Sequence, residues 1–139
     1  MQNFATKTNY VVEKELRVDA ISQWNDTEID IYPDSFVTIA YRGGFCRINE
    51  SFRFFDADGY TTKKAQAGYL LMDQSPGCLV GKIGNSLFHI GKGKVVHNQS
   101  GRLYLAINQF ISSLAFNQLI SDNSYFNVKV TVIPYILIK

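Results

Sequence analysis

Short runs of acidic residues and glycine are the first places where this chain could hold a metal ion. The turn Asp56-Ala57-Asp58-Gly59 resembles part of a calcium loop, in which carboxylate oxygens bind the ion. If these aspartates filled the third and fifth positions of an EF-hand loop, Phe54 would fall at the first position and Ala65 at the twelfth. Neither side chain can bind a metal, so an EF-hand is excluded. The sequence favours a polar turn here and leaves a looser calcium or sugar contact open.

The glycine-rich and histidine-containing segments do not complete a catalytic motif. The run Gly81-Lys82-Ile83-Gly84-Asn85-Ser86 lacks the glycine spacing of a phosphate-binding loop, and no helical pattern follows it. His89 and His97 are the only histidines, and no pair of acids or cysteines near them completes a metal site. Neither is near a serine or cysteine in a nucleophile-elbow sequence. The sequence therefore predicts a protein that is not an enzyme.

Tyrosine is frequent in this chain, and its ring and hydroxyl suit sugar recognition. The ring packs against the C–H face of a sugar while the hydroxyl forms a hydrogen bond, and Asn, Gln and Asp pair with sugar hydroxyls. Six of the eight tyrosines fall in expected strands or at loop edges: Tyr41, Tyr60, Tyr69, Tyr104, Tyr125 and Tyr135. Tyrosine is also ordinary at strand edges, so this observation is compatible with either role.

These candidate residues must be positioned by strands, because the clearest pattern in the chain is an alternation of apolar and polar residues. The segment 126–132 alternates valine or phenylalanine with polar residues, and 103–107 repeats the pattern. Further strands are expected at 16–20, 29–31, 36–41, 52–55, 69–72, 78–83 and 87–90, with turn markers such as Gly43-Gly44 and Gly84-Asn85 between them. Many short strands with frequent turns predict an antiparallel sandwich or barrel. Apolar spacing of three and four residues predicts a short helix or compact loop over 110–120.

Composition limits the class of protein. The chain has 139 residues, of which 46% are apolar and 19% charged, so we expect one folded domain over 1–139 and no intrinsic disorder. The N-terminus has no signal-peptide pattern and no apolar run is long enough to insert into a membrane, so the cytoplasm is the default location, with release by non-classical export left open. The bases are scattered, which argues against nucleic acid as a partner. Cys46 and Cys78 are expected to be buried thiols.

Several segments, taken in order, resemble the PA-IL-type galactophilic lectins. The resemblance covers roughly residues 16–132 and is carried by segments that match the family's strand and loop motifs in the right order. These segments are Trp24–Ile29, Asp34–Ala40, Gly77–Gly84 (similar to G-x-L-V-x-K-I-G), Phe88–Gly91 (similar to F-x-I-G), Ser100–Asn108 (similar to G-x-L-x-L-x-x-N-D) and Asp122–Val128 (similar to N-x-S-G-x-F-x-V). The resemblance implies a jelly-roll-like, galactose-binding-domain-like sandwich of two antiparallel sheets. It also implies a calcium ion that bridges protein and sugar, without catalysis.

The sequence departs from the family pattern where that calcium and sugar would bind. Gln109 stands in place of the acid of the family's Asn-Asp pair, and the residues near the second ligand pair are Asp122 and Asn123. The resemblance places an early loop carbonyl at about Ile31. The family's His-Pro-x-Gln sugar clamp falls near Lys64-Ala65-Gln66-Ala67, which keeps neither residue type in place. Because calcium affinity depends on ligand charge, losing a carboxylate should weaken the binding of the ion.

Two interpretations follow from these observations. In the first, the chain is a carbohydrate-binding, lectin-like module that binds a glycan, with specificity altered from galactose and with possible calcium assistance. Its sugar-binding residues are then Tyr60, Thr61, Lys64, Gln66 and Asp122, and its calcium ligands are Ile31, Gln109, Asp122 and Asn123. In the second, the sugar site has decayed, and the apolar segment Phe110–Ile120 is a contact surface in a protein-interaction or structural subunit. A homo-oligomer is expected in both.

Overall fold

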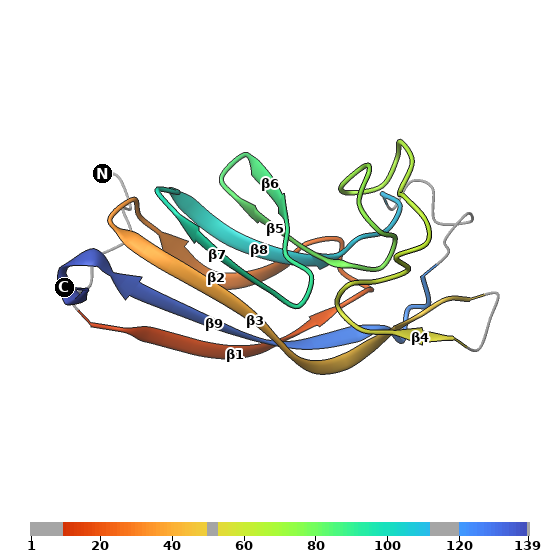
Figure 1. Cartoon of the computed structure of the whole chain (residues 1–139), viewed down its shortest axis with the longest axis horizontal. Coiled ribbons are helices and arrows are strands. Elements are labelled where there is room, and N and C mark those ends of the chain that lie inside the picture. The colour runs from red at the N-terminus through yellow and green to blue at the C-terminus, as the bar shows by residue number, and fades with distance from the viewer. Residues whose placement is uncertain (1–9, 50–52, 112–119, 139) are drawn as a thin grey trace.

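A computed structural model describes residues 10–49, 53–111 and 120–138, and the regular secondary structure among them is almost entirely β (Figure 1). The strands are β1 (Val12–Asp19), β2 (Asn25–Ile31), β3 (Ser35–Arg47), β4 (Phe54–Phe55), β5 (Leu79–Ile83), β6 (Ser86–His89), β7 (Gly93–His97), β8 (Gly101–Ile107) and β9 (Tyr125–Pro134). A 3-10 turn, Tyr135–Leu137, follows β9. Within the described ranges, no helix has the length and apolar character that a membrane span requires.

The strands form two antiparallel sheets. The first has the order β1-β9-β3-β4, with β7 also paired to β3, and the second has the order β2-β8-β5-β6. The two sheets face each other, as Figure 1 shows, and enclose one main hydrophobic core. The all-β sandwich of two antiparallel sheets that the sequence predicted is therefore confirmed.

The alternation of side chains along the central strands builds this core. Phe126, Val128 and Val130 of β9 point inward from one sheet, and Leu103 and Leu105 of β8 meet them from the other. All five side chains are buried, while the residues between them on β9 are exposed or half-buried. Each buried side chain of this size stabilises the fold by about 2 kcal/mol relative to its exposed state. The alternation of apolar and polar residues in the sequence thus determines which face of each sheet is buried.

Strand β3 is longer than expected, and it corrects one turn prediction. Gly43-Gly44 does not end the strand, because β3 continues through both glycines to Arg47. The register with β9 shifts between Tyr41 and Gly43, which marks a β-bulge. The Tyr41 hydroxyl donates a hydrogen bond of 2.7 Å to the Gly44 carbonyl and holds the bulge closed. Both glycines have positive φ, which explains why they looked like turn residues in the sequence.

Two other segments differ from expectation. Gly93–His97 was not predicted as a strand, but it forms β7 along the edge of β3. The segment 69–72 was predicted as a strand, but it is a loop with one isolated bridge between Tyr69 and Phe110. The helix or compact loop predicted over 110–120 falls mostly on residues 112–119, which lie outside the described residues.

The sandwich has two distinct ends. Val12 at the start of β1 pairs with Val132 near the end of β9, so the first and last described strands begin and finish at the same end. The opposite end is crossed by the long connection between β4 and β5, residues 56–78, which lies at the right of Figure 1. We call this second end the loop end.

The two cysteines yield a first prediction. Cys46 and Cys78 are free and fully buried, and burial raises the pKa of each thiol to about 12 from an ordinary value of 9.0. Because only the thiolate reacts, its population at pH 8 falls roughly a thousandfold relative to a free cysteine. We expect neither thiol to react with a disulfide reagent in the folded protein, and two thiols to react in guanidinium chloride. Rapid labelling of either cysteine in protein with unchanged circular dichroism would contradict this expectation.

Candidate functional site

The loop end gathers most of the residues that the sequence singled out. The connection 56–78 contains Tyr60, Thr61, Lys64 and Gln66, and the turn before β9 contains Asp122 and Asn123. Ile120 links the two segments, because it forms an isolated bridge with Ile48 and its Cδ1 atom lies beside Gly77. Thr61, Lys64, Gln66, Asp122 and Asn123 are all exposed. Side chains about 60 positions apart in the sequence therefore share one end of the sandwich.

Asn108 holds the long connection in place, a role that the sequence did not reveal. Its side chain is fully buried, accepts a hydrogen bond of 2.9 Å from the Leu71 amide and donates bonds of 2.8 Å and 3.2 Å to the carbonyls of Leu71 and Ser75. Its backbone carbonyl also accepts a bond from the Gly77 amide. One asparagine thus satisfies three backbone groups of a loop, which a loop of this length needs in order to keep one shape.

Gln109 has a structural role at the loop end. Its side chain is 2% exposed and its Nε2 donates a hydrogen bond of 2.7 Å to the Ala20 carbonyl. The Ala20 amide in turn donates to the Ser124 carbonyl at 3.1 Å. Gln109 is therefore linked through Ala20 to the turn that carries Asp122 and Asn123. The structure brings these three residues to one end, and the Gln109 amide is bonded to the backbone, which the sequence did not predict.

The turn at Asp122 and Asn123 is anchored on both sides. The Ser121 amide donates to the Arg47 carbonyl at 2.8 Å, and the Arg47 amide donates to the Ser124 hydroxyl at 2.8 Å. Ser121 and Ser124 are buried, whereas the two residues between them are exposed. Two anchored serines thus present a carboxylate and an amide to solvent from a turn of fixed shape.

Tyr60 is less available to a sugar than its sequence context indicated. Its ring stacks on Phe55 with centroids 5.0 Å apart and an angle of 16° between the planes. The cations of Arg53 and Lys63 each lie 5.4 Å from the centroid of this ring. With one face covered and two cations close by, Tyr60 stabilises the base of the loop, and the exposed neighbours Thr61, Lys64 and Gln66 offer the polar contacts.

Ile31 is not at the loop end. It is the last residue of β2, is 3% exposed and pairs with Gly101 at the start of β8, whereas Gln109 follows the end of β8. Eight residues of extended chain separate these points, which corresponds to roughly 25 Å. The structure therefore does not bring Ile31 together with Gln109, Asp122 and Asn123, and its carbonyl cannot complete a ligand set with them.

The acidic turn at Asp56 and Asp58 is paired with a lysine. The Lys92 ammonium lies 3.3 Å from the Asp56 carboxylate and 3.5 Å from the Asp58 carboxylate. These carboxylates, Asp56 first, raise the pKa of Lys92, so the cation stays charged across the physiological range. The polar-turn interpretation is supported, because the amide of Asp58 also donates to the Asp56 side chain at 2.9 Å in a local turn.

The donors at the loop end do not fit a calcium ion. Calcium takes six to eight oxygen ligands and prefers carboxylates. Of the predicted ligands, Asp122 alone carries a charge, the Gln109 amide is bonded to Ala20, and Ile31 lies elsewhere. Across the part of the chain that the structure describes, no group of three histidine, cysteine, aspartate or glutamate residues is arranged to hold a metal ion. We therefore derive no step of recognition from calcium.

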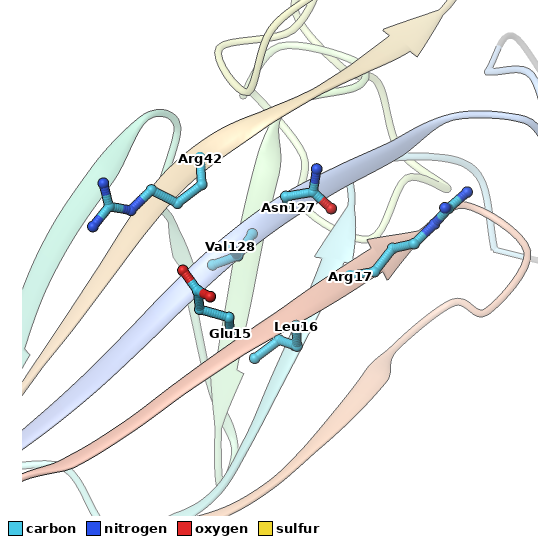
Figure 2. Close-up of a pocket in the computed structure, with 6 residues that line it drawn as sticks. All are labelled: Glu15, Leu16, Arg17, Arg42, Asn127 and Val128. Atoms are coloured by element: carbon cyan, nitrogen blue, oxygen red, sulfur yellow. The ribbon is translucent and has the colours of Figure 1, made fainter.

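A groove lies on the outer face of the first sheet, and the sequence did not single it out. Its cavity measures about 450 Å³ and is lined by Glu15, Leu16, Arg17, Arg42, Asn127 and Val128. Figure 2 shows these residues on three neighbouring strands: β1, β3 and β9. Alternation along β1 and β9 turns Glu15, Arg17 and Asn127 toward water, whereas Leu16 and Val128 face the core. The pairing of strands from opposite ends of the chain is what places them side by side.

Comparison with known proteins was made by sequence and by structure. No protein-family model and no curated protein sequence matches the chain. Among solved structures, it is similar to one described as the EclA N-terminal domain, a PllA-like lectin, with a TM-score of 0.56 and 20% sequence identity. The match covers 86% of this chain and 94% of that domain. At this identity the likeness concerns the fold alone, so the chain has the β-sandwich fold seen in that lectin domain.

Proposed function

We propose that this chain is a non-catalytic carbohydrate-binding module whose sugar site is the loop end. The observation that carries the proposal is the pair of anchored segments there, which hold a hydroxyl, an ammonium, amides and a carboxylate at the surface. These groups belong to Thr61, Lys64, Gln66, Asp122 and Asn123. The fold shared with a PllA-like lectin domain supports the same function.

The chemistry of these groups suits a polyhydroxylated ligand. The Asp122 carboxylate accepts hydrogen bonds from sugar hydroxyls, and charge-assisted bonds of this kind are stronger than neutral ones. The Lys64 ammonium donates to ring or hydroxyl oxygens, and the amides of Gln66 and Asn123 both donate and accept. Because the anchoring bonds of the Asn108 side chain and of Ser121 and Ser124 already fix both segments, little loop entropy is lost on binding.

The ligand proposed for this site differs from galactose. Gln109, which stands in place of the acid of the family's Asn-Asp pair, is buried and bonded to Ala20. The segment that would carry the His-Pro-x-Gln clamp is Lys64-Ala65-Gln66-Ala67, in which Ala65 is buried and the lysine is exposed. The donors and acceptors are thus rearranged, and a different pattern of hydroxyls should be recognised.

A glycan array with purified protein tests this proposal, in buffer with calcium and in buffer with a chelator. We expect binding to at least one glycan in both buffers, because the described donors do not form a calcium site. Replacing Asp122 or Asn123 by alanine should weaken that binding about tenfold, the effect of losing one or two good hydrogen bonds. The matched control is Asn85→Ala, since Asn85 is an exposed turn residue at the opposite end.

Two results would overturn the proposal. The first is an array on which no glycan is bound by protein whose circular dichroism shows an intact β fold. The second is binding that Asp122→Ala, Asn123→Ala and Asn85→Ala leave equal to the parent. The alternative contact surface Phe110–Ile120 falls mostly outside the described residues, although Ile111 within it is exposed. A homo-oligomer remains a prediction, which sedimentation equilibrium tests directly.

A further inference from the structure

The outer face of the first sheet is hollowed across β1, β9 and β3. Gly43 and Ala40 of β3 lie beside Asn127 and Lys129 of β9. A Cβ added at Gly43 would meet nothing closer than the Asn127 amide nitrogen, at 4.0 Å. The groove of about 450 Å³ falls in the size range of small-molecule sites. A second hollow of about 340 Å³ continues it along β1 and shares Glu15 with it.

Two arginines of this groove have no carboxylate partner. Lys129 forms an ion pair of 3.6 Å with Glu13. Within the described residues, neither Arg17 nor Arg42 forms an ion pair or a side-chain hydrogen bond, and both are exposed. Arg17 is nevertheless held in place, because its guanidinium lies 3.8 Å from the centroid of the Tyr125 ring. Two forked cations therefore flank the groove, and one of them is positioned on an aromatic ring.

An aromatic shelf continues the groove toward the loop end. Tyr125, two residues before Asn127, lies on the same face of β9 and pairs with Phe45 of β3. Phe45 is 56% exposed and contacts Phe54, which is 60% exposed, with the ring centroids 5.9 Å apart. Large aromatic side chains this exposed are uncommon on a solvated sheet face, and they mark contact surfaces.

We propose that this groove and shelf form a second glycan site, which binds a sugar that bears a carboxylate. The guanidinium groups of Arg17 and Arg42 point away from each other across the groove (Figure 2), so the sugar carboxylate pairs with Arg17, which matches it with parallel hydrogen bonds, and Arg42 donates to a hydroxyl on the other side. The Asn127 amide and the Glu15 carboxylate bond to hydroxyls. The exposed rings of Phe45 and Phe54 pack against the C–H face of the next sugar ring, beside the Tyr125 ring that Arg17 covers.

The charge on this face favours an acidic sugar over a neutral one or a polyanion. With Glu13 and Lys129 paired, the groove keeps two cations and the single anion Glu15, so it attracts one negative charge. A dense polyanion such as a nucleic acid would instead place phosphates beside Glu15 and Glu13. A neutral sugar would leave both guanidinium groups without an ionic partner. The site lies on strands β1, β3 and β9 and shares no residue with the sugar site proposed at the loop end.

Titration followed by amide chemical shifts tests this second site. The probes are methyl β-glucuronide and methyl β-glucoside, which differ only in a carboxylate at C6, and the methyl glycoside of sialic acid as another carboxylated sugar. We expect the glucuronide to shift the amides around Arg17, Arg42 and Asn127, with an affinity at least tenfold above that of the glucoside. Raising sodium chloride from 0.05 to 0.5 M should lower the affinity for the glucuronide, because salt screens the attraction between the arginine and the carboxylate. The response to the sialoside shows whether the site takes both kinds of acidic sugar.

Variants locate the effect. Arg17→Gln should weaken glucuronide binding about tenfold, toward the affinity of the glucoside, and Arg42→Gln should weaken the binding of both sugars through a lost hydrogen bond to a hydroxyl. Arg102→Gln is the matched control, because it removes a guanidinium from the other sheet and should leave the affinity unchanged. Asp122→Ala should also leave it unchanged, which separates this site from the loop end. Equal binding of glucuronide and glucoside, or the absence of shifts on β1, β3 and β9 with all carboxylated probes, would overturn the proposal.

Discussion

Replacing Asn108 by alanine is expected to lower the free energy of unfolding by about 3 kcal/mol. The substitution leaves the amide of Leu71 and the carbonyls of Leu71 and Ser75 without the partner that now satisfies them. Each backbone group left unpaired inside a protein costs about 1–3 kcal/mol, which partial access of water to the loop reduces. For a chain of this length the melting temperature should fall by about 10 °C. Urea denaturation followed by circular dichroism measures the change.

Asn127→Ala is the control for the effect expected of Asn108→Ala. Asn127 is an exposed asparagine on β9, and its removal should change the free energy of unfolding by less than about 0.5 kcal/mol. A further consequence concerns sugar binding: if Asn108 fixes the connection 56–78, its loss should also weaken binding at the loop end. Equal stability of Asn108→Ala and Asn127→Ala would show that the three hydrogen bonds do not hold the loop.

Gly44→Ala is expected to destabilise the protein by about 4 kcal/mol. Gly44 has a φ of +88°, and an added Cβ would overlap the carbonyl oxygen of Tyr125 and lie 3.0 Å from the Phe126 Cα atom. A left-handed conformation alone costs a residue with a side chain about 1–2 kcal/mol. The overlap adds more, because the obstacle is backbone of the central strand β9 and not a flexible side chain.

Gly43→Ala separates these two contributions. Gly43 also has positive φ, but its added Cβ would lie in open space, 4.0 Å from the nearest atom, the Asn127 amide nitrogen. This variant should lose only the conformational part, about 1–2 kcal/mol. The two variants are compared by thermal and urea unfolding under the same conditions. If they lose the same stability, close packing of β3 against β9 is not the reason for glycine at position 44.

The strands that could be predicted from sequence are those with one face buried in the core and the other exposed to solvent. Alternation over 103–107 and 126–132 marks β8 and β9, because their inward residues pack in the core and their outward residues do not. The same logic failed at Gly43-Gly44, where a bulge inside a long strand uses the same residues as a turn. It also missed β7, where Val96 alone is buried and alternation has too few residues to show.

The candidate site was predictable only in part, for a related reason. The resemblance to known lectin motifs brought Gln109, Asp122 and Asn123 to one end, and the strand order agrees with that placement. The resemblance could not place Ile31, because the position of a backbone carbonyl depends on the end of the sheet at which a strand finishes. Nor does sequence show that an amide such as Gln109 is occupied by a backbone carbonyl far away in the chain.

The outer groove was not predictable at all from local patterns. Arg17, Arg42 and Asn127 are separated by long stretches of sequence, and each looks like an ordinary solvated strand residue. Only the register of β1 with β9 and of β9 with β3 brings them to one face. Surface sites of this type depend on long-range pairing, so a single sequence contains little local signal for them.

The positions of the two chain ends bear on how this domain could be displayed. Tyr10 and Ile138, the outermost described residues, adjoin the start of β1 and the end of β9, on the side away from the connection 56–78 (Figure 1). If the domain were attached to a larger particle through either chain end, Thr61, Gln66 and Asp122 would therefore lie on the side that faces away from that particle. Protein immobilised on a biosensor chip through a C-terminal tag would have the same orientation, with the loop end accessible to injected saccharides.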